Sequence, residues 1–342
     1  HCRLPSTLAV GAHAFEVSLN GQEFTSSALN FTVFADPAVH SLCPSSGPRL
    51  GSTLVRVTGT SLSVGSHYLC AYGDLVVDAS LLSNATSPGA EQVSCVSPFV
   101  ASQGLVPLEV SLNGQNYTRN EVLFSYFDPP RLLLLSPSTG PDRGQTRVRL
   151  MGEQLGRGSH YQVSLAPASA SPALPLVVEA DYAPAISNGS LAFTTPALPG
   201  DGTVRVRVSL NAQQFSSPPG LVFVSYRHPS VVNLSPRCGH GDTRVLISGS
   251  TNLSTGCHML CKLGGGLVVN ATLVDARTFA CVAPPLNNSV LAAPLEISLN
   301  GQQYSSDGVI WTHTEQPRVS SMYPTAGISA GGMVLTVQGA GF

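Results

Sequence analysis

The chain repeats one short stretch four times, Ser-Leu-Asn followed by Gly or Ala and then Gln, and this repeat limits its possible folds more than any other feature. The copies begin at Ser18, Ser111, Ser209 and Ser298. Apolar and polar residues alternate before each copy, which is the period of a half-buried β-strand. Asn-Gly then supplies the positive φ angle of a tight hairpin turn. An aromatic residue follows in each copy: Phe24, Tyr117, Phe215 and Tyr304. We therefore expect one β-hairpin in every structural unit.

The spacing of the copies predicts how the chain is divided. They lie about 90 to 100 residues apart, the size of one β-sandwich domain. A second block, a proline, a Pro/Gly turn and a strand ending at glycine, opens each unit and begins near Pro37, Pro130, Pro229 and Pro317. The repeats predict five pieces: the end of a unit at 1–36, complete units at 37–128, 129–228 and 229–316, and the start of a further unit at 317–342.

A third block, Gly-Ser/Cys-His, shows which cysteines correspond. It begins at Gly65, Gly158 and Gly256. The alignment predicts two disulfides, Cys70 with Cys95 and Cys261 with Cys281. In the middle unit, Val163 and Phe193 stand at the two positions that correspond to Cys70 and Cys95. If the two cysteines are bonded, we expect both to be lost together. Closing such a loop stabilises a domain by about 3 kcal/mol in the chain-entropy account, and apolar packing can replace that contribution.

The other four cysteines are less constrained by the repeat. Cys238 and Cys257 occur only in the third complete unit, so the simplest expectation is that they bond to each other. Cys2 is expected to bond a residue upstream of the fragment. Cys43 has three open choices, which are Cys2, an upstream cysteine and another molecule. Cysteines used in pairs indicate an oxidising compartment.

Charged residues make up only 11% of the chain, against roughly 25% in a typical soluble domain. Glycans on Asn-x-Ser/Thr sequons are a second way to keep a surface soluble. Seven sequons qualify: Asn30, Asn84, Asn116, Asn188, Asn252, Asn270 and Asn287. Asn233 is a weaker candidate because Pro236 follows its serine. We expect N-linked glycans, with O-linked glycans on the many hydroxyl-bearing side chains as a further possibility.

Several function classes find little support. The net charge of −2 and the single lysine, Lys262, provide no basic face for nucleic acid. No run of eighteen apolar residues predicts a membrane span. Cys257, His258 and Cys261 fall short of the four ligands of a structural zinc site, and the unit junctions offer at most one acid each for calcium. We expect no metal, no cofactor and no catalytic site, and we assign His67, His160 and His258 local structural roles.

The opening block, the Cys-x-x-Pro that begins at the second cysteine and the closing Phe124-Ser125-Tyr126 strand resemble the IPT/TIG family of immunoglobulin-like domains. The resemblance covers all 342 residues. The middle unit departs from it by lacking both cysteines and by a longer stretch at 166–175. The resemblance implies an all-β fold of tandem antiparallel β-sandwiches in an extended array. It implies a module and not an activity.

Proline at every junction leaves little slack between units, which favours a stiff rod. The leading hypothesis is a non-enzymatic, extracellular structural or adhesive glycoprotein that forms part of a cell-surface or flagellar filament, with itself or neighbouring proteins as partners. The alternative is the stalk of a plexin-like or fibrocystin-like receptor ectodomain. A third reading, spacers of a carbohydrate-active enzyme, requires a catalytic domain outside this sequence.

Overall fold

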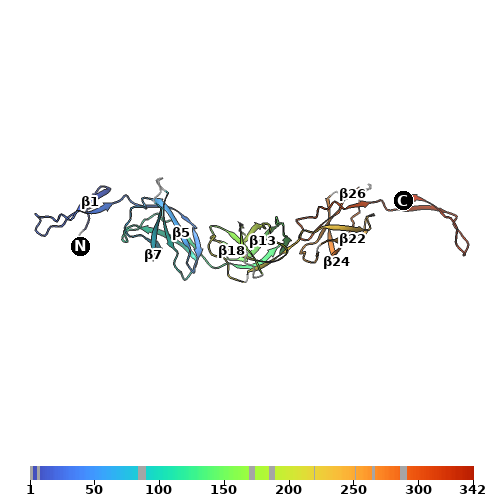
Figure 1. Ribbon diagram of the computed structural model, residues 1–342, viewed down its shortest axis with the longest axis horizontal. Coiled ribbons are helices and arrows are strands. Elements are labelled where there is room, and N and C mark those ends of the chain that lie inside the picture. The colour runs from blue at the N-terminus through green and yellow to red at the C-terminus, as the bar shows by residue number, and fades with distance from the viewer. Residues whose placement is uncertain are drawn as a thin grey trace.

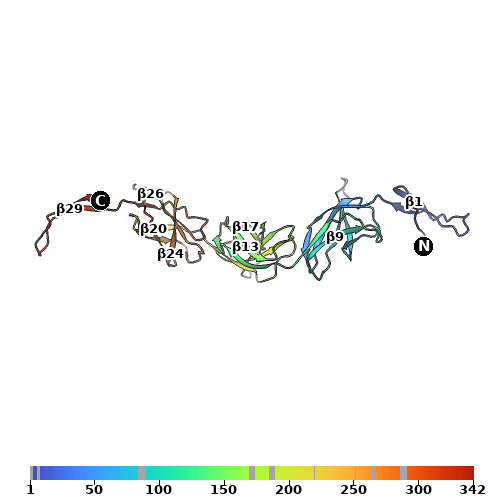
Figure 2. The same cartoon turned by 180° about the vertical axis from the view of Figure 1, so that it is seen from behind.

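The computed structural model describes residues 1–342 apart from 1–2, 6–7, 84–89, 169–173, 185–188, 219, 251, 264–265 and 286–290. Three β-sandwiches lie end to end, with a two-stranded hairpin beyond each outer sandwich (Figure 1). The view from behind shows the same single row, with the two termini toward opposite ends (Figure 2). The extended all-β array expected from the repeats is therefore the observed fold.

Unit 1 comprises residues 37–128. Its strands are β3 (Ala38–Cys43), β4 (Ser46–Pro48), β5 (Leu54–Thr60), β6 (Leu69–Tyr72), β7 (Leu75–Ser83), β8 (Glu91–Val96), β9 (Gly104–Ser111) and β10 (Leu123–Phe127). They are hydrogen-bonded in the order β3-β5-β8-β7-β6-β9-β10-β4. The long strand β7 pairs with β6 at its start and with β8 at its end. One strand thus belongs to both layers of the sandwich.

Unit 2 comprises residues 129–228 and follows the same path with β7 divided in two. Its strands are β11 (Arg131–Ser136), β12 (Thr139–Pro141), β13 (Arg147–Glu153), β14 (Gln162–Pro167), β15 (Leu176–Glu179), β16 (Asp181–Ala183), β17 (Ser190–Thr194), β18 (Gly202–Ser209) and β19 (Leu221–Tyr226). They form two sheets, β11-β13-β17-β16 and β12-β19-β18-β14-β15. Part of the longer stretch at 166–175 lies outside the described residues.

Unit 3 comprises residues 229–316. Its strands are β20 (Val231–Ser235), β21 (Cys238–Gly239), β22 (Arg244–Gly249), β23 (Leu260–Leu263), β24 (Leu267–Asp275), β25 (Thr278–Val282), β26 (Leu291–Pro294), β27 (Glu296–Ser298) and β28 (Ile310–His313). The outer hairpins are β1 (Gly11–Phe15) with β2 (Leu29–Val33), and β29 (Arg318–Tyr323) with β30 (Thr336–Ala340).

Each unit has its own apolar core, because its strands alternate between core and solvent. In β5, for example, Val55 and Val57 are fully buried while Leu54 and Arg56 point outward. Burying one such side chain stabilises a domain by roughly 1.5–3 kcal/mol. Three separate clusters of buried side chains result, one for each complete unit. The units are therefore distinct domains.

The repeated loop forms the expected turn. Its glycine adopts positive φ, 72° at Gly114 and 75° at Gly301, and Ala212 takes the same conformation at 62°. The asparagine keeps an ordinary φ, and its side-chain oxygen accepts backbone N–H groups two and three residues ahead. This Asx-type turn explains why asparagine recurs at this position.

Candidate inter-unit interface

Two segments meet wherever one complete unit follows another. The first is the acceptor segment, residues 46–54 of unit 1 and 139–147 of unit 2, which leads into the long inner strand β5 or β13. The second is the docking loop, residues 211–214 of unit 2 and 300–303 of unit 3, which contains the repeated asparagine. Each docking loop contacts the acceptor segment of the preceding unit.

In the first interface, two glutamines of the docking loop bind the backbone of the acceptor segment. The Gln213 side chain accepts from Leu54 N–H at 2.9 Å and donates to Leu54 C=O at 2.8 Å. Gln214 donates to Ser52 C=O at 2.8 Å and accepts from the Thr53 hydroxyl at 3.1 Å. The contacts to Leu54 and Ser52 are hydrogen bonds to the backbone, so they do not depend on which side chains the acceptor segment carries.

The backbone of Leu54 is available because β3 ends too early to cover it. The pairing of β3 with β5 stops at Cys43 opposite Arg56, two residues short of Leu54. The first N–H and C=O of β5 on that side therefore have no partner within unit 1, and every backbone N–H and C=O needs a hydrogen-bonding partner. The Gln213 amide completes the hydrogen bonding of this strand.

Asn211 is a buried residue of the docking loop that binds the acceptor segment through its side chain. It is 1% exposed, and its Nδ2 lies 3.3 Å from Ser46 C=O and 3.2 Å from the Thr53 hydroxyl. The same nitrogen donates to Gln214 Oε1 at 2.6 Å, which holds that side chain toward unit 1. One buried asparagine therefore shapes the turn through its oxygen and binds the preceding unit through its nitrogen.

The second interface repeats these bonds one unit further along. The Gln302 side chain exchanges two hydrogen bonds of 2.9 Å with the backbone of Arg147. Gln303 donates to Gln145 C=O at 2.7 Å and accepts from Thr146 at 3.1 Å. Asn300 Nδ2 lies within 3.5 Å of Thr139 C=O and 3.3 Å of the Thr146 hydroxyl. The interface is a repeated structure and not an isolated contact.

An aromatic side chain crosses each junction in the opposite direction. Phe127 ends the last strand of unit 1, yet it packs in the apolar cluster of unit 2 and is 3% exposed. Tyr226 ends unit 2 and packs in the cluster of unit 3, also 3% exposed. Phe34 is the corresponding residue before unit 1 and packs against its core while remaining only partly buried. We call these residues the aromatic plugs.

The sequence marked these residues as repeats without revealing their role. The signal was the persistence of Asn, where Asp would form the same turn, and of the Gln that follows it. A second signal was Thr53 and Thr146 at the same offset in successive units, both completely buried. Only the end-to-end arrangement of the units shows that these groups meet.

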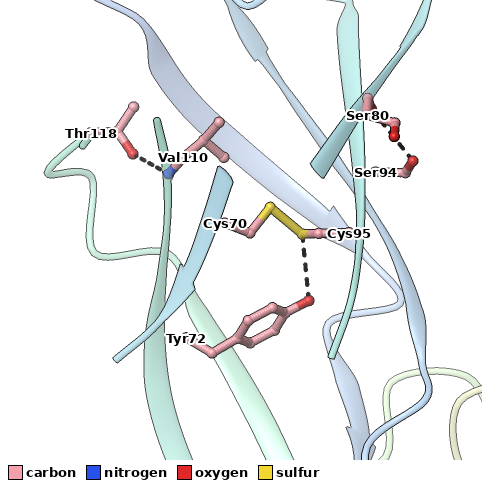
Figure 3. Close-up of a disulfide and its surroundings, with 7 residues drawn as sticks. All are labelled: Cys70, Tyr72, Ser80, Ser94, Cys95, Val110 and Thr118. Atoms are coloured by element: carbon pink, nitrogen blue, oxygen red, sulfur yellow. Dashed lines mark hydrogen bonds between the residues drawn. A yellow bond between two sulfur atoms is a disulfide. The ribbon is translucent and has the colours of Figure 1, made fainter. Parts of the chain in front are cut away.

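The two predicted cysteine pairs each form a disulfide, with Cα atoms 6.3 Å apart for Cys70–Cys95 and 6.4 Å apart for Cys261–Cys281. Each bond joins the two layers inside one unit. The hydroxyl of Tyr72 lies 3.6 Å from Cys95 Sγ (Figure 3). These bonds lie in the cores and not at the inter-unit interface.

The predicted bond between Cys238 and Cys257 is not formed, because both cysteines are free and exposed. Cys257 faces unit 2, where its sulfur accepts from the Thr139 hydroxyl at 3.2 Å. Cys238 occupies the position of Thr139 in its own unit, since both residues pair with the final strand in the same register. That position faces the next unit, so the two thiols lie at opposite junctions. Cys43 is also free, and Cys2 lies outside the described residues.

The sequons have different surroundings. Asn30, Asn252 and Asn270 are exposed. Asn116 is exposed too, but it occupies the place of Gln214 and Gln303 in the repeated loop. The remaining three candidates, Asn84, Asn188 and Asn287, lie outside the described residues.

The three histidines occupy equivalent positions, each bridged to the loop asparagine of its own unit. A side chain at Gly114 or Gly301 would collide with the ring of His67 or His258, so the histidine and the glycine fit together locally. Within the described ranges, no cluster of three or more His, Cys, Asp or Glu side chains could hold a metal ion. The same ranges contain no helix long and apolar enough to cross a membrane.

Sequence comparison finds relatives among large proteins. The chain is 31% identical to rat plexin-A3 over 217 residues, which is 61% of this chain and 11% of plexin-A3. It is 24% identical to mouse fibrocystin-L over 346 aligned residues, which is 99% of this chain and 7% of that protein. The chain thus spans about a tenth or less of these relatives. Among solved structures, the full extracellular region of plexin A4 matches 92% of this chain at 20% identity with a TM-score of 0.46, covering 28% of that chain.

The family profile of the IPT/TIG domain matches residues 37–126 and 229–310, which together make up half of the chain and fall in units 1 and 3. Unit 2 has the same strand order and interfaces, with Val163 and Phe193 where its neighbours carry the disulfide. The chain therefore belongs to the IPT/TIG domain family.

Proposed function

We propose that this chain is a stiff, non-enzymatic spacer within an extracellular, cell-surface protein. The observation that carries the proposal is the repetition of one interface, bond for bond, at both junctions between complete units. A repeated interface of this kind gives successive units the same relative orientation. The function is to hold other parts of a protein at a fixed distance.

The physical basis of stiffness is the combination of three restraints. Proline at 129 and 229 limits the backbone of each connection. The aromatic plug anchors the end of one unit in the core of the next, and the docking loop binds back onto the first unit. Bending a junction would require breaking several hydrogen bonds together, those of the glutamines at the surface and those of the buried asparagine, each contributing about 0.5–1.5 kcal/mol. Neighbouring domains of one chain usually move relative to each other more freely than these three restraints allow.

The relatives support a place in a receptor-type ectodomain. Plexin-A3 and fibrocystin-L are large proteins in which the aligned region is a small part. By this proposal, residues 1–36 and 317–342 belong to further units of the same array, and partner recognition and membrane attachment lie elsewhere. The protein partners are the segments or neighbours that the spacer connects.

The same proposal places the chain outside the cell, where disulfides persist and where proteins arrive carrying the N-glycans added at their sequons during secretion. The exposed asparagines Asn30, Asn252 and Asn270 are the proposed glycan sites. Protein secreted from a eukaryotic host should lose apparent mass on treatment with an N-glycan-cleaving enzyme. An unchanged mass would contradict glycosylation while leaving the spacer role untouched.

Small-angle X-ray scattering tests the spacer role directly. The wild-type chain should show one long, narrow distribution of interatomic distances. Replacing both glutamines of each docking loop by alanine (Gln213, Gln214, Gln302 and Gln303) should shorten the average particle and broaden this distribution, because the units then reorient. Thermal unfolding should remain close to wild type, since none of these side chains belongs to a core.

The matched control is Gln115→Ala, which changes the equivalent loop of unit 1, where no described residue binds the side chain. This variant should scatter like the wild type. If the four-glutamine variant also scatters like the wild type, the docking loops do not set the shape, and the proposed mechanism of stiffness is wrong.

A second candidate function is a surface or flagellar filament built by lateral association. The observation that favours it is a set of apolar side chains on the outer face of unit 2, where Leu133, Leu134 and Met151 are 44%, 50% and 37% exposed. Analytical ultracentrifugation over a wide concentration range decides this point. Concentration-dependent association lost in Leu133→Ser with Leu134→Ser would support the filament, and a monomer at all concentrations would reject it.

A further inference from the structure

The repeated loop of unit 1 has the shape of a docking loop but no bound acceptor segment. Its turn is closed like the others, with Asn113 Oδ1 accepting the N–H groups of Gln115 and Asn116 at 3.0 and 2.9 Å. No described residue accepts a hydrogen bond from Asn113 Nδ2 or binds the Gln115 side chain. Asn211 and Asn300 are 1% and 4% exposed in their interfaces, whereas Asn113 is only half-buried.

A groove of 700 Å³ lies beside this loop, at the connection between residues 1–36 and unit 1. One wall is the connection itself, with the aromatic plug Phe34 and Pro37. The other wall is the loop, with Asn113, Gln115 and Tyr117. At the other two junctions the same pair of elements, plug and docking loop, meets the acceptor segment of the preceding unit. Phe34 is also less buried than the plugs Phe127 and Tyr226.

We propose that this groove binds the acceptor segment of the unit whose last hairpin is residues 1–36. The inference rests on the proposed spacer function and extends it to a third interface. The occupant is defined by its chemistry. It is the start of a long inner strand whose first N–H and C=O are free to bind an amide, as those of Leu54 are, and the residue two positions earlier offers its own C=O, as Ser52 does. Gln115 takes the role of Gln213 and Gln302, and Asn113 takes the role of Asn211 and Asn300.

One residue makes this interface different from the other two. Asn116 stands where Gln214 and Gln303 donate to a second backbone carbonyl, and its side chain is one methylene shorter. The interface before unit 1 therefore has a counterpart of Gln213 and Gln302 but none of Gln214 and Gln303. It is the weakest of the three interfaces. A glycan on Asn116 would also occupy the groove, so docking requires Asn116 to remain unmodified.

The test uses the natural polypeptide extended upstream through the whole of that unit, and measures amide hydrogen exchange at single-residue resolution. Gln115→Ala should speed exchange at one upstream amide, at the first residue of the inner strand, by about tenfold or more. The matched control is Gln213→Ala, which should do the same at the Leu54 amide that it contacts at 2.9 Å. Asn116→Gln should slow exchange at the upstream segment, because the longer amide adds the missing contact.

Each other outcome has a defined meaning. If Gln213→Ala exposes the Leu54 amide and Gln115→Ala exposes no upstream amide, the docking proposal is wrong and the spacer function stands. If neither variant changes exchange, the interface and the spacer function fail together. A concentration-dependent effect would assign the groove to a second copy and overturn the proposal. Mass spectrometry that finds a glycan on Asn116 of the folded secreted protein would overturn it as well.

Discussion

The interior of unit 2 differs from that of unit 1, whereas the two interfaces that flank unit 2 are the same. Unit 1 joins its layers through Cys70–Cys95, and unit 2 carries Val163 and Phe193 in the same register. Val163 lies opposite Val208 as Cys70 lies opposite Val110, and Phe193 lies opposite Val148 as Cys95 lies opposite Val55. The docking loops repeat their hydrogen bonds with nearly identical lengths.

This contrast separates two physical requirements. A core needs buried volume, and either a disulfide or a large apolar side chain can fill it. The interface needs hydrogen-bond donors and acceptors at fixed positions, and fewer residue types satisfy that need. We therefore expect the cores to tolerate exchange between apolar side chains of similar volume, and the Asn and Gln positions of the docking loops to tolerate little. Four predictions test this contrast, from the largest expected effect to the smallest.

Phe193→Ala should have the largest effect because it empties the space that the disulfide occupies in unit 1. Phe193 is 3% exposed and lies within the cluster of unit 2, so the loss in the free energy of unfolding should be about 3–5 kcal/mol. Hydrogen exchange resolved by unit measures this loss. It should appear in unit 2 alone, and Phe193→Leu should lose much less. A uniform loss in all three units would contradict independent cores.

Removal of a disulfide should have the next largest effect, and in a different unit. The paired change Cys70→Ala with Cys95→Ala should lower the stability of unit 1 by about 3 kcal/mol, since the bond closes a loop with a sequence separation of 25. Chemical denaturation of the wild type with and without a thiol reductant is the companion measurement. Units 1 and 3 should weaken under reduction while unit 2 keeps its midpoint, and a shift in unit 2 would break the comparison.

Asn211→Ala and Asn300→Ala should weaken their interfaces by similar amounts of about 1–3 kcal/mol, because each leaves buried polar partners unpaired. The measured quantity is protection of the amides of Leu54 and Arg147 from hydrogen exchange. Asn113→Ala is the matched control, since it loses the same turn bonds but no described inter-unit bond. If all three variants behave alike, the asparagine acts through the turn only and not through the interface.

Alkaline pH should affect unit 1 before unit 2, with the smallest effect per side chain of the four. Burial raises the pKa of both Tyr72 and Tyr126 well above the ordinary value of 10.0. These phenols stay neutral in the folded state and ionise in the unfolded chain, so stability is intact below pH 10 and falls above it. At pH 11 the loss should be about 1 kcal/mol for each tyrosine.

Denaturation of unit 1 at pH 8 and pH 11 measures this loss. Tyr72→Phe should remove about half of the difference between the two pH values, because the remaining half belongs to Tyr126. The buried cluster of unit 2 contains no tyrosine among its fully buried members, so unit 2 should respond less. An equal fall in the wild type and in Tyr72→Phe would show that the buried phenol is not the cause.

Much of the fold was determined by local sequence. Alternation of side chains fixed strands such as β5, and the Asn-Gly turns fixed the hairpins, because both depend on residues that are neighbours in the chain. The pairing of Cys70 with Cys95 followed from comparing units, because unit 2 lacks both cysteines and such a joint loss indicates that the two are bonded. The same comparison predicts the boundaries of the repeated units.

Contacts between units were decided only by the tertiary structure. The expected bond between Cys238 and Cys257 was wrong because their separation in space depends on which end of the sandwich each strand reaches, and the alignment of repeats does not contain that information. Gln213 and Leu54 are 159 positions apart, and nothing local connects a turn to the start of a strand in another domain. Their contact arises because the aromatic plug and the short connection orient one folded unit against the next. A sequence repeat determines what each unit is, and packing between folded surfaces determines how the units are joined.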